Sequence, residues 1–189
     1  MKTYWRTIIT FLVSAIFMVS CSNQEQDMLN DIAALENKIA QFDGDDLPDK
    51  DLVMDLVEAY DNFAQAFPEH AQTPDFLFEA GRYCMSYNEP HKAVAFFERI
   101  VNNYPDYEKH PDSYFLKAFV YDSKLNNIPQ ARLNYEKFIE MYPDHEMANE
   151  ASLLIDLLGR SLDDIIADFE RMNLEDAHED SESSDYTED

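Results

Sequence analysis

The chain has 189 residues, with 39 Asp and Glu against 14 Lys and Arg, which gives a formal net charge of −25. This length fits one domain, and 46% apolar with 13% aromatic residues is enough for a core, which excludes a wholly disordered chain. The acidic balance argues against nucleic acid as a partner, because phosphate binding needs clustered Lys and Arg, and three glycines beside eight prolines argue against glycine-rich phosphate loops.

Residues 1–20 have the features of an export signal. Lys2 and Arg6 precede an apolar run from Ile8 to Val19. This run has twelve residues, which as a helix rise about 18 Å, whereas a helix that spans a membrane core needs about 20 residues. A cationic start followed by a short apolar run is typical of a secretory signal. We therefore expect residues 1–20 to be a signal peptide of the lipoprotein type and residues 21–27 to be a lipidated tether.

The end of this signal, Met18-Val19-Ser20-Cys21, resembles the bacterial lipobox, in which an aliphatic residue and two small residues precede a cysteine. The resemblance implies diacylglycerol on the Cys21 thiol, cleavage before it and acylation of the new amino group. Three acyl chains would anchor the chain stably in a membrane. Ser22 implies, by the family's sorting habit, export to the outer membrane. The alternatives are an uncleaved membrane anchor and a plain secreted protein.

Apolar residues recur at three- and four-residue steps after residue 27, and no segment keeps a period of two. This pattern predicts an all-α domain over residues 28–172. The expected helices span residues 28–42, 50–67, 74–87, 90–103, 111–126, 128–141, 145–158 and 161–172. The prolines that fit helix starts are Pro90 and Pro129, and those that fit just past helix ends are Pro68, Pro105 and Pro143. Gly159 and Ser161 are expected to be a C-cap and an N-cap.

Three shorter segments have their own interpretations. Residues 28–42 carry Ile32, Leu35, Ile39 and Phe42, a spacing that fits a short coiled coil or the first helix of the domain. Residues 43–51 are acidic, but the glycine and glutamate of an EF-hand loop are missing, so an interhelical linker is expected. Residues 173–189 are expected to be a disordered acidic tail, since eight acids and no Lys or Arg follow residue 174.

Three stretches of the chain repeat one another, at residues 59–68, 96–105 and 134–143. Each has an aromatic residue eight positions before a proline, a bulky apolar residue five before it and an aromatic residue directly before it. The three prolines are 37 and 38 residues apart. Such a period is the mark of a repeat architecture.

Two units in this array resemble the tetratricopeptide repeat, a helix–turn–helix unit of about 34 residues. Residues 74–105 supply Leu77, Ala80, Gly81, Ala93, Phe97, Ile100 and Pro105. Residues 112–143 supply Phe115, Ala118, Ala131, Tyr135, Phe138 and Pro143, with Phe119 in place of the glycine. Residues 28–68 match in their second helix alone, and residues 145–172 resemble a degenerate capping pair. The resemblance implies an all-α, right-handed solenoid of three to four antiparallel helix pairs.

The long spacing and the aromatic–proline ending also resemble tetratricopeptide lipoproteins of the diderm envelope, the group of the D subunit of the outer-membrane β-barrel assembly machinery and the Tol–Pal accessory protein. This resemblance implies a role in outer-membrane assembly or in envelope and division organisation. The expected partners are other envelope proteins or peptides, and the membrane through the acyl chains at Cys21. The periplasmic face is the expected location.

No known catalytic or metal-binding motif stands out in the chain. HExxH, paired CxxC, GxSxG and P-loop patterns do not occur. His70 and His145 are interpreted as solvated loop histidines, and Cys84 as a buried small hydrophobe. We therefore expect no enzyme, no cofactor and no metal site. An envelope hydrolase built on a carboxylate pair remains a rival hypothesis.

Stacked helical hairpins leave a curved binding face, which the family forms from the first helix of each pair. Carrying the family's groove positions across places six residues there: Phe78, Arg82, Met85, Leu116, Val120 and Lys124. Such a mixed groove favours an extended peptide or an amphipathic helix. The alternative is that Phe78 and Leu116 belong to the core. A second hypothesis for the whole protein is a surface lipoprotein that binds glycan or nutrient ligands, although the single tryptophan, Trp5, lies in the signal.

Overall fold

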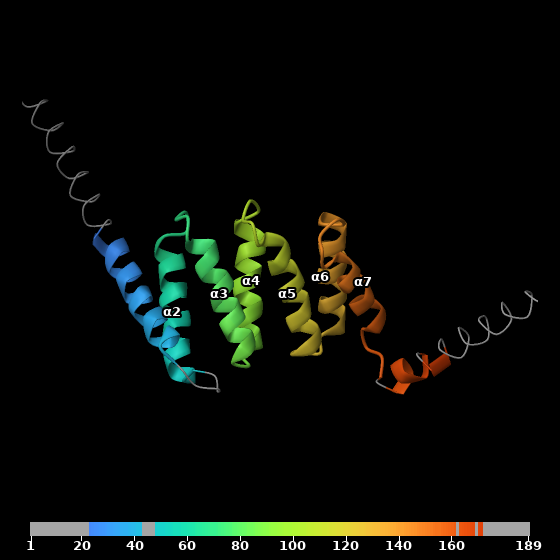
Figure 1. The fold of residues 1–189 in the computed structure, drawn as a ribbon. Helices are drawn as coiled ribbons and strands as arrows, with labels where there is room; N and C mark the ends of the chain where they lie inside the picture. Colours follow the sequence, from blue (N-terminus) through green and yellow to red (C-terminus); the bar gives the residue numbers. More distant parts are fainter. Residues whose placement is uncertain (1–22, 43–47, 162, 169, 172–189) are drawn as a thin grey trace, which may run out of the picture.

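The structure, a computed structural model, describes residues 23–42, 48–161, 163–168 and 170–171. Within these ranges the chain is helical and contains no strand. A first helix covers residues 23–40 and a last one begins at residue 163. Between them lie α2 (Lys50–Ala66), α3 (Thr73–Ser86), α4 (Pro90–Asn103), α5 (His110–Ser123), α6 (Ile128–Met141) and α7 (Ala148–Leu157). Figure 1 shows them as a row of antiparallel helices, each beside the next in sequence.

The helix ends follow from local chemistry. Four helices, α3 to α6, carry proline in their first turn, where a missing N–H group costs no hydrogen bond. The Asp49 carboxylate caps α2 by accepting the N–H groups of Asp51 and Leu52 at 3.0 and 3.1 Å. Gly159 follows α7 with φ +75°, and the Ser161 hydroxyl accepts the Asp164 N–H at 3.1 Å. The predicted pair of caps is thus confirmed.

The tight turns inside the two central hairpins use asparagine in the same way. Asn88 joins α3 to α4 with φ 58°, and Asn126 joins α5 to α6 with φ 48°. Asparagine enters this left-handed region more readily than most residues that carry a side chain. Asn126 also explains why α5 stops at Ser123 although the apolar spacing predicted a helix to residue 126.

Helices α2 to α7 each pack against the next helix in sequence, and Gly81 makes the contact between α3 and α4 close. A Cβ atom at Gly81 would lie 2.7 Å from Cε1 of Phe97, whose ring is fully buried. The absence of a side chain at Gly81 therefore lets α3 and α4 approach closely. Small residues at a helix–helix contact allow such a close approach, and here the space is taken by the aromatic ring of the facing helix.

The core runs along the whole array. One buried cluster extends from the first helix to α5, and a second joins α5, α6 and α7. In the first helix Ile32 is buried, and Leu35 and Ile39 pack against the same cluster. The helix is therefore the first element of the solenoid, as one of the two interpretations of residues 28–42 had it.

The loops between hairpins share one geometry. His70, Tyr107 and His145 each donate a backbone N–H, at 3.1 Å, to the carbonyl of the aromatic residue three positions before. The rings of His70 and His145 pack edge-on against Phe63 and Phe138, with centroids 5.1 and 5.3 Å apart. Their Nδ1 atoms accept the backbone N–H two residues on, at 3.2 and 3.3 Å. The prediction that both histidines are merely solvated is corrected, since each is half-buried and orders its loop.

Most expected helix bounds agree with the structure, and those of α4 and α6 coincide with it. The first helix already includes residues 23–27, which were expected to precede it, so the described part of the predicted tether is helical. Helix α7 begins three residues later than predicted, because residues 145–147 belong to the ordered loop. In the part of the chain that is described, no helix is long and apolar enough to cross a membrane. The signal peptide, Cys21 and the acidic tail lie outside the described residues.

Candidate functional site

Two of the six predicted groove residues are core residues. Phe78 is 6% exposed and Val120 is fully buried. The Phe78 ring packs against Phe97 and Tyr107, with centroids 6.0 and 6.3 Å away, and the Lys109 amine lies 4.9 Å from its centre. The long loop after α4 thus folds over the residue that the family pattern places in a groove. The assignment of Phe78 and Val120 as exposed groove residues is corrected accordingly.

The other four predicted residues keep some surface on the face formed by α3 and α5. Arg82 is exposed and pairs with Glu79 on its own helix at 3.2 Å. Lys124 is exposed at the end of α5, whereas Met85 and Leu116 are half-buried against the core. These four residues do not line the cleft described next.

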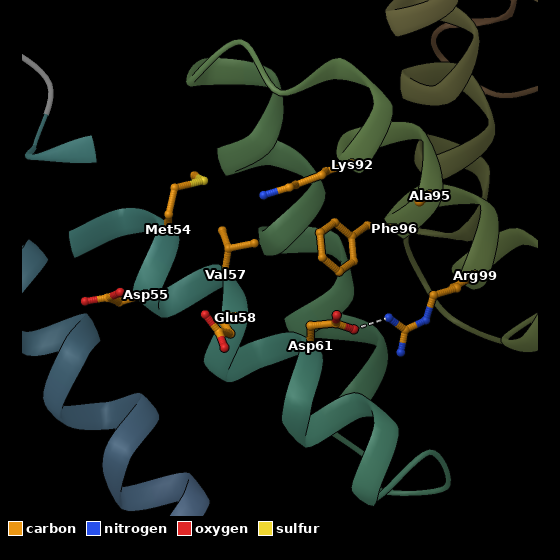
Figure 2. A pocket seen from close by; sticks show the side chains of 9 residues that line it. All are labelled: Met54, Asp55, Val57, Glu58, Asp61, Lys92, Ala95, Phe96 and Arg99. Atoms are coloured by element: carbon orange, nitrogen blue, oxygen red, sulfur yellow. Dashed lines mark hydrogen bonds and ion pairs between the residues drawn. The ribbon is translucent and has the colours of Figure 1, made fainter. Parts of the chain in front are cut away.

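A cleft of about 430 Å³ opens between α2 and α4, on the second helices of two successive hairpins (Figure 2). We call it the α2–α4 cleft. It is lined from α2 by Met54, Asp55, Val57, Glu58 and Asp61, and from α4 by Lys92, Ala95, Phe96 and Arg99. No residue of α3 takes part, so α2 and α4 are neighbours on this face.

The floor of the α2–α4 cleft is apolar and its rims are charged. Val57 and Phe96 are buried at the bottom. Asp55 and Glu58 are exposed on the α2 rim, and Lys92 is exposed on the α4 rim. Among the residues that the structure describes, these three make no ion pair with one another or with another side chain. The middle of the cleft therefore offers apolar surface between uncompensated charges.

Ion pairs join the two helices at both ends of the cleft. Lys50 Nζ lies 2.7 Å from Glu89 Oε1, and Arg99 pairs with Asp61 (Figure 2). The hydrogen bond from Lys50 holds the pKa of the Glu89 carboxyl below its ordinary value. Because the partners advance together along the chain, α2 and α4 run in the same direction. The pairs tie the helices at two points and leave the surface between those points open.

The cleft is open because one small residue stands where the next repeat has a large one. Aligning Phe97 with Tyr135 matches Ala95 to Leu133 and Phe96 to Asn134. Leu133 is 44% exposed at the corresponding position of α6. Asn134 is buried there and its amide donates to the Gln130 carbonyl at 2.7 Å. In the α2–α4 cleft Ala95 and Phe96 thus supply a small side chain and an apolar floor residue, where α6 has Leu133 and Asn134.

Two buried titratable side chains outside the cleft, His110 and Cys84, have structural roles. His110 lies between the Tyr142 hydroxyl, 2.5 Å from its Nδ1, and the Val101 carbonyl, 3.1 Å from its Nε2. Burial raises the pKa of the Cys84 thiol to about 11, as expected for a small core residue. Within the described ranges, no group of three or more His, Cys, Asp or Glu side chains is placed to hold a metal ion.

The sequence contained a signal for this cleft that family positions do not capture. Acids recur at three-residue steps on α2, at Asp55, Glu58 and Asp61, and cations stand seven residues apart on α4, at Lys92 and Arg99. Both series lie on one side of a helix. At the position of Ala95 the three repeats carry Glu58, Ala95 and Leu133, so the residue there differs from repeat to repeat.

A family model for the tetratricopeptide repeat matches residues 75–107 and 112–145. These ranges contain nearly all of the α3–α4 and α5–α6 hairpins, each with the loop that follows it. No curated protein matches the chain. The chain therefore carries two tetratricopeptide repeats, a module of protein–protein interaction scaffolds, within a helical array that continues on both sides of them.

Proposed function

We propose that this protein is a lipid-anchored scaffold of the bacterial cell envelope, which holds a partner protein on its solenoid. The observation that carries the proposal is the order of two features along the chain. A lipobox-like sequence ends at Cys21, and the first helix of the interaction module is already formed at residue 23, the first residue that the structure describes. Acyl chains on Cys21 would thus hold the array close to the bilayer surface.

The charge of the chain supports an anchor made of lipid. A net charge of −25 would be repelled by anionic lipid headgroups, so the surface of the protein gives little basis for attachment by charge. Burying several acyl chains overcomes such repulsion, since each buried methylene adds about 0.8 kcal/mol. Ser22, in the position that sorts such proteins, favours the outer membrane and its periplasmic face, where the protein would help assemble that membrane or organise the envelope.

The anchor is tested by metabolic labelling with an alkyne fatty acid, followed by membrane fractionation. The wild type is expected to carry label and to sediment with outer membranes. Cys21→Ala should lose both properties. Cys84→Ala is the matched control, because it removes the other cysteine, which is buried in the core. Label retained by Cys21→Ala, or absent from the wild type, would contradict the anchor.

The location is tested by protease treatment of intact cells. A periplasmic scaffold is protected until the outer membrane is opened. Digestion in intact cells would instead place the protein on the surface, where binding of glycan or nutrients would become the better hypothesis. Crosslinking mass spectrometry in native envelopes is then expected to join this chain to another envelope protein.

A further inference from the structure

We propose that the α2–α4 cleft is the docking site for a basic amphipathic helix of a partner protein. This inference rests on the proposed scaffold function and adds to it the place and the chemistry of binding. Tetratricopeptide repeats are expected to bind through the first helices of their hairpins, whereas this cleft lies between second helices (Figure 2).

The shape of the cleft fits a helix. Two helices that run in the same direction leave a groove between them, and a third helix can lie along it with its apolar side chains between theirs. Ala95 projects only a methyl group here, so an apolar side chain of the partner can reach Val57 and Phe96 on the floor. The Lys50–Glu89 pair and the Asp61–Arg99 pair mark the two ends of this groove.

The charges on the rims determine which helix fits. Asp55 and Glu58 are three residues apart on the α2 rim, which they share with the first helix and its Lys38, and in Figure 2 the Asp55 carboxylate points away from the groove, so Glu58 is the closer of the two. A partner helix with Lys or Arg along the flank that faces α2 would compensate them. On the other flank one carboxylate would meet Lys92. The net charge of −25 adds a long-range attraction for a basic partner.

A second copy of this chain is a poorer occupant. Within the described residues its exposed large apolar helix residues are Leu133 and Met141 on α6, Leu153 and Leu157 on α7, and Ile166 on the last helix. Those on α7 are accompanied by acids, Glu150 and Asp156, on the same helix. Docking α7 of one copy into the cleft of another would bring these acids toward the carboxylates of the α2 rim. Like charges at such an interface oppose association.

The test uses designed helical peptides as probes. Both are about 18 residues long, or five helical turns, and carry a leucine stripe. In one peptide several lysines flank the stripe on one side and a single glutamate stands on the other, so that the peptide is basic; in the second, glutamates flank both sides. Fluorescence anisotropy measures their binding to the full-length chain in nanodiscs of zwitterionic lipid, with empty nanodiscs as the blank.

Three variants locate the binding. Ala95→Leu copies the next repeat and should fill the cleft, which we expect to weaken binding of the lysine-flanked peptide by about tenfold or more. Leu133→Ala makes the reverse change in the next repeat and should leave binding unchanged. The double variant Asp55→Lys/Glu58→Lys should prefer the glutamate-flanked peptide. Circular dichroism confirms that each variant keeps its helices.

Other outcomes would overturn the assignment. The cleft is not the docking site if neither peptide binds, if Ala95→Leu binds as tightly as the wild type, or if both size variants weaken binding equally. Self-association of the full-length chain that Ala95→Leu abolishes would show a second copy as the occupant instead. Failure of the scaffold function itself looks different, because the chain would then crosslink to no envelope protein. Crosslinks that persist unchanged in Ala95→Leu would support the scaffold function and contradict docking in the cleft.

Discussion

Adding one methyl group at Gly81 should destabilise the protein through Phe97. The new Cβ would lie 2.7 Å from Cε1 and 2.8 Å from Cζ of a ring that is fully buried and cannot swing into solvent. Overpacking of this kind costs about 1–3 kcal/mol. Alanine regains about 1 kcal/mol of helix propensity over glycine. For Gly81→Ala we therefore expect a net loss of about 1 kcal/mol in the free energy of unfolding.

Urea unfolding followed by circular dichroism measures this loss, in a Cys21→Ala background that keeps the chain free of acyl groups. Ala95→Gly on the exposed side of α4 calibrates the propensity alone, with an expected cost of about 1 kcal/mol. Phe97→Leu replaces the ring with a smaller side chain, so Gly81→Ala should cost less in that variant. We expect a coupling energy between the two substitutions above about 0.5 kcal/mol. If Gly81→Ala stabilised the protein by its full propensity and showed no coupling, the close approach of α3 and α4 would be refuted.

Three further changes test the interior. The Tyr135 hydroxyl is buried without a hydrogen-bond partner among the described residues, so Tyr135→Phe should be neutral or stabilising by up to about 1 kcal/mol in urea unfolding; a clear loss would reveal a partner. Burial lowers the pKa of the Lys117 amine, which lies near Glu98 and Lys137. Below this lowered pKa the native state bears the full cost of a buried ammonium. The stability therefore rises as the pH increases from the lowered pKa toward 10.5, where the amine titrates in the unfolded chain. Lys117→Met should therefore be more stable than the wild type at pH 7 by a margin that shrinks as the pH rises, and a margin independent of pH would contradict this. Because burial raises the pKa of the Cys84 thiol to about 11, a chain lacking the other cysteine should react with a disulfide reagent at pH 8 roughly two orders of magnitude more slowly when folded than in urea, and equal rates would show an accessible thiol.

The sequence predicted helices best where proline and apolar spacing agreed. Both signals mark the ends of α4 and α6, whose expected limits coincide with the structure. The helical state of residues 23–27 was missed because these residues are polar and carry no apolar period. Glutamine and glutamate favour a helix through their propensity, and propensity leaves no periodic trace. The end of α5 was missed because Leu125 continues the spacing while Asn126 turns the backbone.

The candidate site was harder to predict, for a physical reason. Family positions assume a unit of standard length, but here the longer loop after α4 places Tyr107 and Lys109 against Phe78 and buries it. The α2–α4 cleft depends on a difference between repeats, Ala95 against Leu133. A repeat pattern describes what its units share, so it does not reveal a space that one unit leaves open.

Photo-crosslinking in living cells tests the central claim most directly. A photoreactive residue replaces Glu58 on the rim of the cleft or, as the control, the exposed Glu140 on α6. From Glu58 we expect one adduct with an envelope protein that disappears in Ala95→Leu and persists in Leu133→Ala. The same adduct formed equally from Glu140, or one that Ala95→Leu leaves unchanged, would contradict docking in the cleft.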